Sequence, residues 1–173
     1  MNRITDVRKP VALNRDSITQ LVMQFYEDVR ADSILGPTFE AALEGRWASH
    51  LSRMIEFWST VALGSRSFTG NVFAKHMAVP GVTAVHFERW LHLWSWHTQA
   101  LFDHATARRL QQAADGIARN LYRGYFGALP VSTSLHRRSA IAAIAATEQA
   151  ALPLTVWHRM ENCSESSKRR NRR

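Results

Sequence analysis

Apolar residues recur at spacings of three and four along most of the chain, and this periodicity constrains the fold more than any other feature. Such spacing gathers apolar side chains on one face of an α-helix, whereas a half-buried strand needs alternation. β-Branched runs are few, and turn-forming residues separate the periodic stretches. The pattern therefore predicts an all-α fold, with helices over residues 17–31, 46–63, 83–104 and 105–126 and at most two helical turns within residues 70–80.

Turn-forming residues also predict where the first helix ends. Asp32, Gly36 and Pro37 follow its last apolar residue, so we expect it to stop there and the next helix to begin near Arg46. Gly64 follows the second helix as a natural cap.

Length and charge divide the chain into two parts. Its 173 residues, 46% of them hydrophobic, suit one domain with a single core. Residues 1–127 carry 14 basic and 11 acidic side chains, whereas residues 128–173 carry 8 and 3. We therefore predict a domain over residues 1–127 and a basic C-terminal appendage over residues 128–173, disordered or with an Ala-rich helix between Leu135 and Ala151.

Several protein classes are excluded by what the sequence lacks. No run of 18 apolar residues could span a membrane, and the N-terminal residues contain no hydrophobic signal region. The single cysteine, Cys163, rules out an internal disulfide and a cysteine zinc cluster. Nucleotide-binding, zinc-protease and hydrolase motifs are absent. These features predict a cytoplasmic protein without a membrane partner.

Six tryptophans and eight histidines are more than a plain helical core needs, because a buried indole or imidazole requires a hydrogen-bond partner. Four of the histidines, His86, His92, His97 and His104, share one predicted helix. Along a helix His86 and His97 lie about 16 Å apart, too far for one metal ion. We interpret these four as ordinary surface or boundary histidines.

His50 and His76 are more informative. His50 lies on the apolar side of its predicted helix, and His76 follows a short segment after the next turn. Two imidazoles placed in this way can face each other across a flat apolar ligand such as haem, with one of them bound to its metal. From the pattern alone, however, two ordinary core or surface histidines remain the favoured interpretation.

Six short segments together resemble the truncated, or 2/2, haemoglobins, and within them the third group. They occur in the family's order and at close to its spacing: Phe25-Tyr26-Glu27-Asp28-Val29-Arg30, Leu35-Gly36-Pro37-Thr38-Phe39, Trp47-Ala48-Ser49-His50, Phe57-Trp58, Lys75-His76-Met77 with Pro80, and Phe87-Glu88-Arg89-Trp90-Leu91. The resemblance covers residues 17–127. It implies a globin-like two-over-two helical sandwich around haem b, in a monomeric domain.

The resemblance also implies residue roles. His76 matches the proximal iron ligand, whose second ring nitrogen should donate to a backbone carbonyl. Tyr26 and Trp90 match distal residues that donate hydrogen bonds to a diatomic ligand, and His50 matches a distal histidine that gates access. The wall positions of the haem cavity correspond to Phe39, Met54, Phe57 and Trp58, and cations that could reach the haem propionates are Lys75 and Arg53.

Reversible binding of oxygen, nitric oxide or carbon monoxide at a pentacoordinate iron is the function that the resemblance implies. Two donors near the ligand would slow oxygen release, which argues against simple oxygen transport. The alternatives are an enzyme that oxidises nitric oxide to nitrate or acts on peroxide, supplied with electrons by an unidentified reductase, and a haem-free basic module that contacts nucleic acid. The appendage lacks the interleaved aromatic residues and the motif expected of a nucleic-acid binder, so the last alternative is disfavoured.

Overall fold

Helices alone make up the regular structure of residues 10–127, which is the part of the chain that the computed structural model describes. The predicted all-α fold is therefore confirmed. In chain order the helices are α1 Arg15–Ala31, α2 Leu35–Leu43, α3 Trp47–Leu63, α4 Val72–Met77, α5 Ala84–Leu101 and α6 His104–Phe126.

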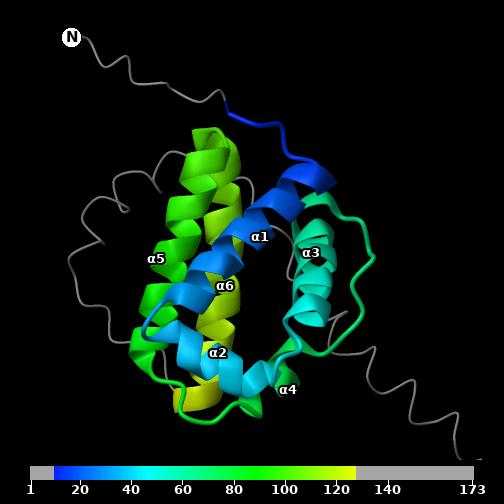
Figure 1. The fold of residues 1–173 in the computed structure, drawn as a ribbon. Helices are drawn as coiled ribbons and strands as arrows, with labels where there is room; N and C mark the ends of the chain where they lie inside the picture. Colours follow the sequence, from blue (N-terminus) through cyan, green and yellow to red (C-terminus); the bar gives the residue numbers. More distant parts are fainter. Residues whose placement is uncertain (1–9, 128–173) are drawn as a thin grey trace, which may run out of the picture.

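The four long helices form two pairs. α1 packs against α3, α5 packs against α6, and α1 also crosses over α5, which joins the pairs into a two-over-two sandwich. In Figure 1, α5 and α6 stand side by side, with α1 crossing them and α3 on the other side. The short helices lie at one end, where α2 contacts α1 and α5, and α4 contacts α6.

Aromatic packing joins the two pairs at the centre. The ring of Trp94 on α5 stacks on Trp58 of α3 at 4.0 Å, and Phe25 of α1 meets the edge of Trp94 at 5.0 Å. All three side chains are buried. Because the indole N–H of Trp94 donates to the carbonyl oxygen of Leu110 at 3.2 Å, burial leaves this donor satisfied.

A capping box explains where α1 begins. The Asn14 side chain accepts the backbone N–H of Ser17 at 2.9 Å, and the Ser17 hydroxyl oxygen accepts the backbone N–H of Asn14 at 2.9 Å. From there the apolar face of α1 is buried along its length through Ile18, Leu21, Val22, Phe25, Tyr26 and Val29. This face is the one that the sequence periodicity predicts.

The structure corrects the prediction for residues 32–45, where α2 forms in place of a connection. Gly36 and Pro37 do not break this helix because they occupy its first turn, where a backbone N–H has no partner within the helix and proline is tolerated. The Asp32 carboxylate accepts the backbone N–H groups of Ile34 and Leu35, both at 2.9 Å, and so starts the helix.

Gly36 is required for another reason. A Cβ at this position would lie 2.6 Å from the carbonyl oxygen of Arg30, so α2 can approach the end of α1 only without a side chain there. This contact sets the direction in which α2 leaves α1.

The other predicted helices are confirmed with small shifts at their ends, and α4 is the short helix predicted within residues 70–80. The possible helix between Leu135 and Ala151 lies outside the described residues. None of the helices in residues 10–127 is both long and apolar enough to cross a membrane.

Candidate functional site

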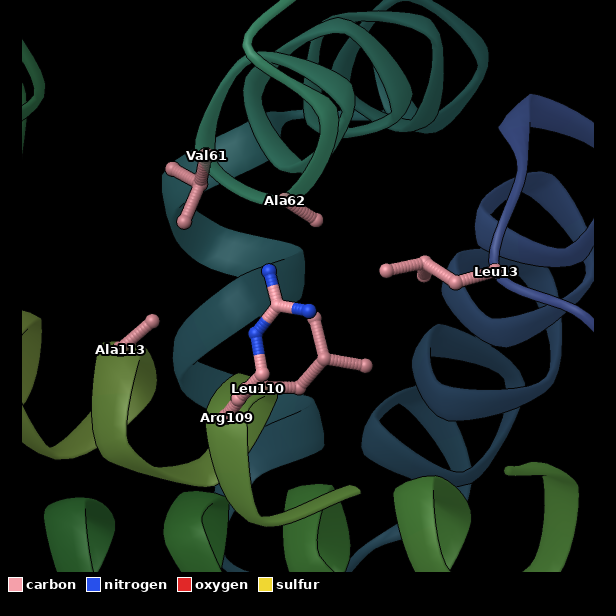
Figure 2. A pocket seen from close by; sticks show the side chains of 6 residues that line it. All are labelled: Leu13, Val61, Ala62, Arg109, Leu110 and Ala113. Atoms are coloured by element: carbon pink, nitrogen blue, oxygen red, sulfur yellow. The ribbon is translucent and has the colours of Figure 1, made fainter. Parts of the chain in front are cut away.

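A cavity of about 560 Å³ opens at the end of the molecule where the two short helices lie. This volume falls in the range of small-molecule and cofactor sites. A second cavity, between the C-terminal end of α3 and the N-terminal part of α6, holds only about 20 Å³, which is room for about one water molecule (Figure 2). The large cavity is therefore the candidate site.

All nine predicted site residues line the large cavity, and so does Arg53. They come from five helices: Tyr26 from α1, Phe39 from α2, His50, Arg53, Met54, Phe57 and Trp58 from α3, Lys75 and His76 from α4, and Trp90 from α5. Residues separated by up to 64 positions in the sequence thus meet in one place. The interpretation of His50 and His76 as unrelated core or surface histidines does not fit this arrangement.

Tyr26 is the most deeply buried polar residue of the cavity wall, with 4% of its surface exposed. Its ring meets the edges of Phe39 at 5.9 Å and His50 at 5.0 Å. Burial raises the pKa of Tyr26, an effect that hydrogen bonding with Trp90 only partly offsets. The phenol is therefore neutral at any physiological pH and keeps its proton as a hydrogen-bond donor.

Stacking holds Trp90 in place beside Tyr26. Its ring stacks on Trp94, one helical turn further along α5, at 5.7 Å, and it meets the edge of Phe25 at 5.4 Å. Because an indole nitrogen can donate a hydrogen bond but not accept one, Trp90 adds a second donor to the same wall.

His50 has a buried Nε2 atom without a hydrogen-bond partner among the described residues. Burial lowers the pKa of His50 to about 4, and repulsion from Arg53, and from His76 when it is protonated, acts in the same direction. The imidazole is thus neutral near pH 7. A buried polar atom that lacks a partner costs about 1–3 kcal/mol, which indicates that the cavity is built to receive a polar group or water at this point.

His76 lies in the last turn of α4, and a hydrogen bond at its Nδ1 atom holds its ring. The Nδ1 atom lies 2.8 Å from the carbonyl oxygen of Val72, one turn earlier, and therefore carries the proton and donates it. The Nε2 atom keeps its lone pair. Burial lowers the pKa of His76, partly offset by the hydrogen bond to Val72, so the ring is neutral, which is the form that binds a metal. Although much of the side chain is exposed, His76 lines the cavity.

The charged side chains of the cavity wall are all cationic. Arg46, Arg53 and Lys75 line it, whereas no aspartate or glutamate does. Arg53 lies over the ring of Phe68 at 5.4 Å and donates to the carbonyl oxygen of Thr69 at 3.3 Å. Such a wall suits an apolar molecule that carries carboxylates.

Sequence reasoning missed two polar features of this wall. Arg46 precedes His50 by four residues, a helical spacing that could have revealed it. His86 likewise precedes Trp90 by four residues and lines the cavity, where it links α5 to α2. Its Nδ1 atom accepts the backbone N–H of Thr83 at 3.2 Å, so its Nε2 atom donates to the Thr38 hydroxyl at 3.0 Å.

The remaining histidines of α5 and α6 fit the interpretation made from their spacing. His97 lies 2.8 Å from a carboxylate oxygen of Asp28 on α1, and His92 and His104 are exposed. No group of three or more histidine, cysteine, aspartate or glutamate side chains within residues 10–127 could hold a metal ion.

Comparisons with known proteins agree with this geometry. The chain is 31% identical over 109 residues to the group 3 truncated hemoglobin ctb of Campylobacter jejuni, with 61% of this chain and 86% of that protein covered. This chain belongs to the group 3 truncated haemoglobins. The crystal structure of a group III truncated hemoglobin from Campylobacter jejuni matches it with a TM-score of 0.62 at 30% identity, over 65% of this chain and 91% of that one. A scan against protein-family models gave no match.

The residues present fit the haem group that this family of globins implies. The cavity is apolar over most of its wall, its exposed cations match propionate carboxylates, and the imidazole of His76 presents a free Nε2 atom. The buried Nε2 atom of His50 and the donors of Tyr26 and Trp90 provide a polar patch for a small ligand.

Proposed function

We propose that this truncated haemoglobin binds haem b with the Nε2 atom of His76 as the proximal iron ligand, and holds a diatomic gas, oxygen first, beside Tyr26 and Trp90. One observation carries the proposal: a single cavity is lined both by a neutral histidine with a free lone pair and by two aromatic hydrogen-bond donors. When bound, the haem supplies an iron atom with a coordination position open to a gas molecule.

Hydrogen-bond donors favour ligands that carry partial negative charge when they are bound. The Tyr26 hydroxyl and the Trp90 indole N–H both donate into a site from which most water is excluded, where a hydrogen bond is stronger than in water. Oxygen accepts such bonds when it binds a ferrous haem, and carbon monoxide accepts them poorly. The two donors therefore favour retention of oxygen over its rapid delivery.

Three cations at the cavity wall are suited to hold the haem propionates. Arg46, Arg53 and Lys75 are exposed yet line the cavity, and Arg46 also pairs with Glu44 at 3.4 Å. On the distal side the neutral His50 stands between Tyr26 and Trp47, with ring centroids at 5.0 and 6.3 Å. From there its side chain can open or close access to the donors.

Oxidation of nitric oxide to nitrate is the second candidate function, with a reductase as the electron source. The pair of donors favours it, because oxygen that is released slowly remains available to a second diatomic molecule. We expect nitrate in proportion to nitric oxide added to the oxygenated protein. Displacement of oxygen by nitric oxide without nitrate would contradict this second function and leave gas binding untouched.

The test of the main proposal is haem binding by the wild-type protein and by His76→Ala. Wild-type protein should bind one haem per chain, with a ferrous spectrum typical of one histidine ligand. His76→Ala should lose haem or require added imidazole to recover that spectrum, and it should also lose the thermal stability that bound haem confers. The matched control is His92→Ala, an exposed histidine of α5. An unchanged haem content and ferrous spectrum in His76→Ala would refute the assignment.

A further inference from the structure

The helix that carries His76 has little support of its own. α4 contains six residues, none of them buried, and it packs mainly against α6. An isolated helix of this length is unstable in water. Its position must therefore come from contacts outside the helix.

Tyr125, near the end of α6, provides one such contact at the residue that matters most. Its hydroxyl donates to the backbone carbonyl oxygen of His76 and also lies 3.3 Å from the carbonyl oxygen of Val79. The backbone N–H of Val79 donates to the same His76 carbonyl at 2.8 Å. The Tyr125 hydroxyl thus closes the turn that follows His76 and ties it to α6.

Gly124 provides the second contact. A Cβ at this position would lie 2.6 Å from the ring of Phe73 and 2.7 Å from the sulfur of Met77, both on α4. The missing side chain is what lets α4 lie directly on α6, so that the Tyr125 hydroxyl reaches the carbonyl of His76. An alanine would force these two α4 side chains to move.

Hydrogen bonds therefore hold His76 at its ring and at its backbone. Its ring is held by the carbonyl oxygen of Val72, within α4, and its backbone is held by Tyr125, from α6. The hydrogen bond to Val72 fixes the rotation of the imidazole ring. The hydrogen bond from Tyr125 fixes where the backbone of His76 lies relative to the cavity. A change at Tyr125 must consequently reach the Nε2 atom through the backbone.

We propose that Tyr125 is a positioning residue for the proximal ligand: through the His76 carbonyl it fixes how the imidazole meets the haem iron, and Gly124 makes this contact possible. The inference rests on the proposed function, in which His76 holds the haem. It assigns to the end of α6 control over how firmly and in what orientation His76 would hold the haem.

The experiment compares wild-type holoprotein with Tyr125→Phe and Gly124→Ala. Resonance Raman spectra of the ferrous, ligand-free form report the iron–histidine stretching frequency, and transfer of haem to an excess of another apo-globin reports its release. In Tyr125→Phe we expect the stretching band to shift and haem release to accelerate about two- to tenfold, as loss of one hydrogen bond implies. Gly124→Ala should shift the same band.

Tyr122→Phe is the matched control, because Tyr122 lies on the same helix, does not line the cavity and packs on Phe87 with ring centroids 5.4 Å apart. It should leave the stretching band and the release rate at their wild-type values. A wild-type band in both Tyr125→Phe and Gly124→Ala would overturn the inference, even if urea unfolding showed lower stability. Absence of any iron–histidine band from the wild-type protein would overturn the proposed function itself.

Discussion

Two hydrogen-bond donors line the cavity in which we propose that a gas molecule binds. Tyr26 and Trp90 each carry one proton that can be donated in a hydrogen bond, and burial keeps Tyr26 protonated near pH 7. Tyr26 is oriented by contacts with Phe39 and His50, and Trp90 by its stack on Trp94. The electrostatic character of the distal wall therefore resides in two atoms held by apolar packing.

Replacement of either donor should accelerate oxygen dissociation from the ferrous protein. We expect Tyr26→Phe and Trp90→Phe each to raise the rate by about tenfold per 1.4 kcal/mol of hydrogen bonding lost. Carbon monoxide dissociation should change much less, since carbon monoxide accepts hydrogen bonds poorly. Stopped-flow or flash-photolysis kinetics with both gases measure the two rates.

The control variants carry the same kinds of substitution at positions that do not line the cavity. Trp96→Phe changes a tryptophan of the same helix that is 66% exposed, and Tyr122→Phe changes a tyrosine outside the cavity wall. Both should leave the kinetics unchanged. Equal acceleration for oxygen and carbon monoxide in the cavity variants would show that bulk, and not hydrogen bonding, controls release.

Asp32 ties the start of α2 to its neighbours. The Asp32 carboxylate caps its start through two backbone N–H groups and accepts a hydrogen bond from Arg89 of α5, and only 4% of this side chain is exposed. Burial by itself raises the pKa of Asp32, but hydrogen bonds from Leu35, Arg89 and Ile34 outweigh it and hold the pKa below its usual value of 3.8. Asp32 thus links the end of α1, the start of α2 and α5.

Asp32→Ala should destabilise the fold by about 1–2 kcal/mol at pH 7, the range expected for a lost helix cap. Because folding lowers the pKa of Asp32, the stabilisation is present above pH 3.8 and is lost as the pH falls through that value towards the folded-state pKa. The gap between wild type and variant should therefore close under acid conditions. Urea unfolding of the apo-protein, followed by circular dichroism from pH 7 to pH 3, measures the gap.

Glu88→Gln offers a matched control for Asp32→Ala, because it removes an exposed carboxylate on α5. It should leave the stability within about 0.5 kcal/mol of wild type, as is usual for exposed positions. A gap for Asp32→Ala that stays constant down to pH 3 would mean that the carboxylate charge contributes nothing to the position of α2.

At the scale of the whole molecule, every residue of the cavity wall lies between Tyr26 and Tyr125. The last helix of the described part ends at Phe126, and Gly127 caps it with a backbone φ of 70°, a left-handed conformation that glycine adopts freely. We therefore propose that residues 1–127 form the haem domain and that residues 128–173 are a separate basic appendage.

A chain that ends after Leu129 should fold, bind haem and keep the oxygen kinetics of the full-length protein. The reason is that it retains all the helices and cavity residues described above. Haem titration, thermal unfolding and oxygen dissociation measured on both lengths provide the comparison. Failure of the shorter chain to retain haem would show that residues 128–173 pack on the domain, and the boundary would then be wrong.

The sequence by itself determined the long helices, because their apolar faces repeat at helical spacing and every buried residue of α1 obeys that period. It also predicted His76, Tyr26 and Trp90 as site residues through the family resemblance of their neighbours, and all three line the cavity. It did not predict α2, because Gly36 and Pro37 are breakers inside a helix and only a chain already folded shows that they occupy its first turn.

Tertiary structure alone decided which pairs of residues on different helices form hydrogen bonds at the cavity wall. Thr38 and His86 are 48 positions apart and meet through a hydrogen bond between two helices, and Tyr125 reaches His76 across 49 positions. No local period links such pairs. The distances within these pairs depend on how closely the helices pack. At two helix contacts, Gly36 and Gly124 allow this close packing because they have no side chain. Helical period is a property of neighbouring residues, whereas the site depends on the approach of whole helices.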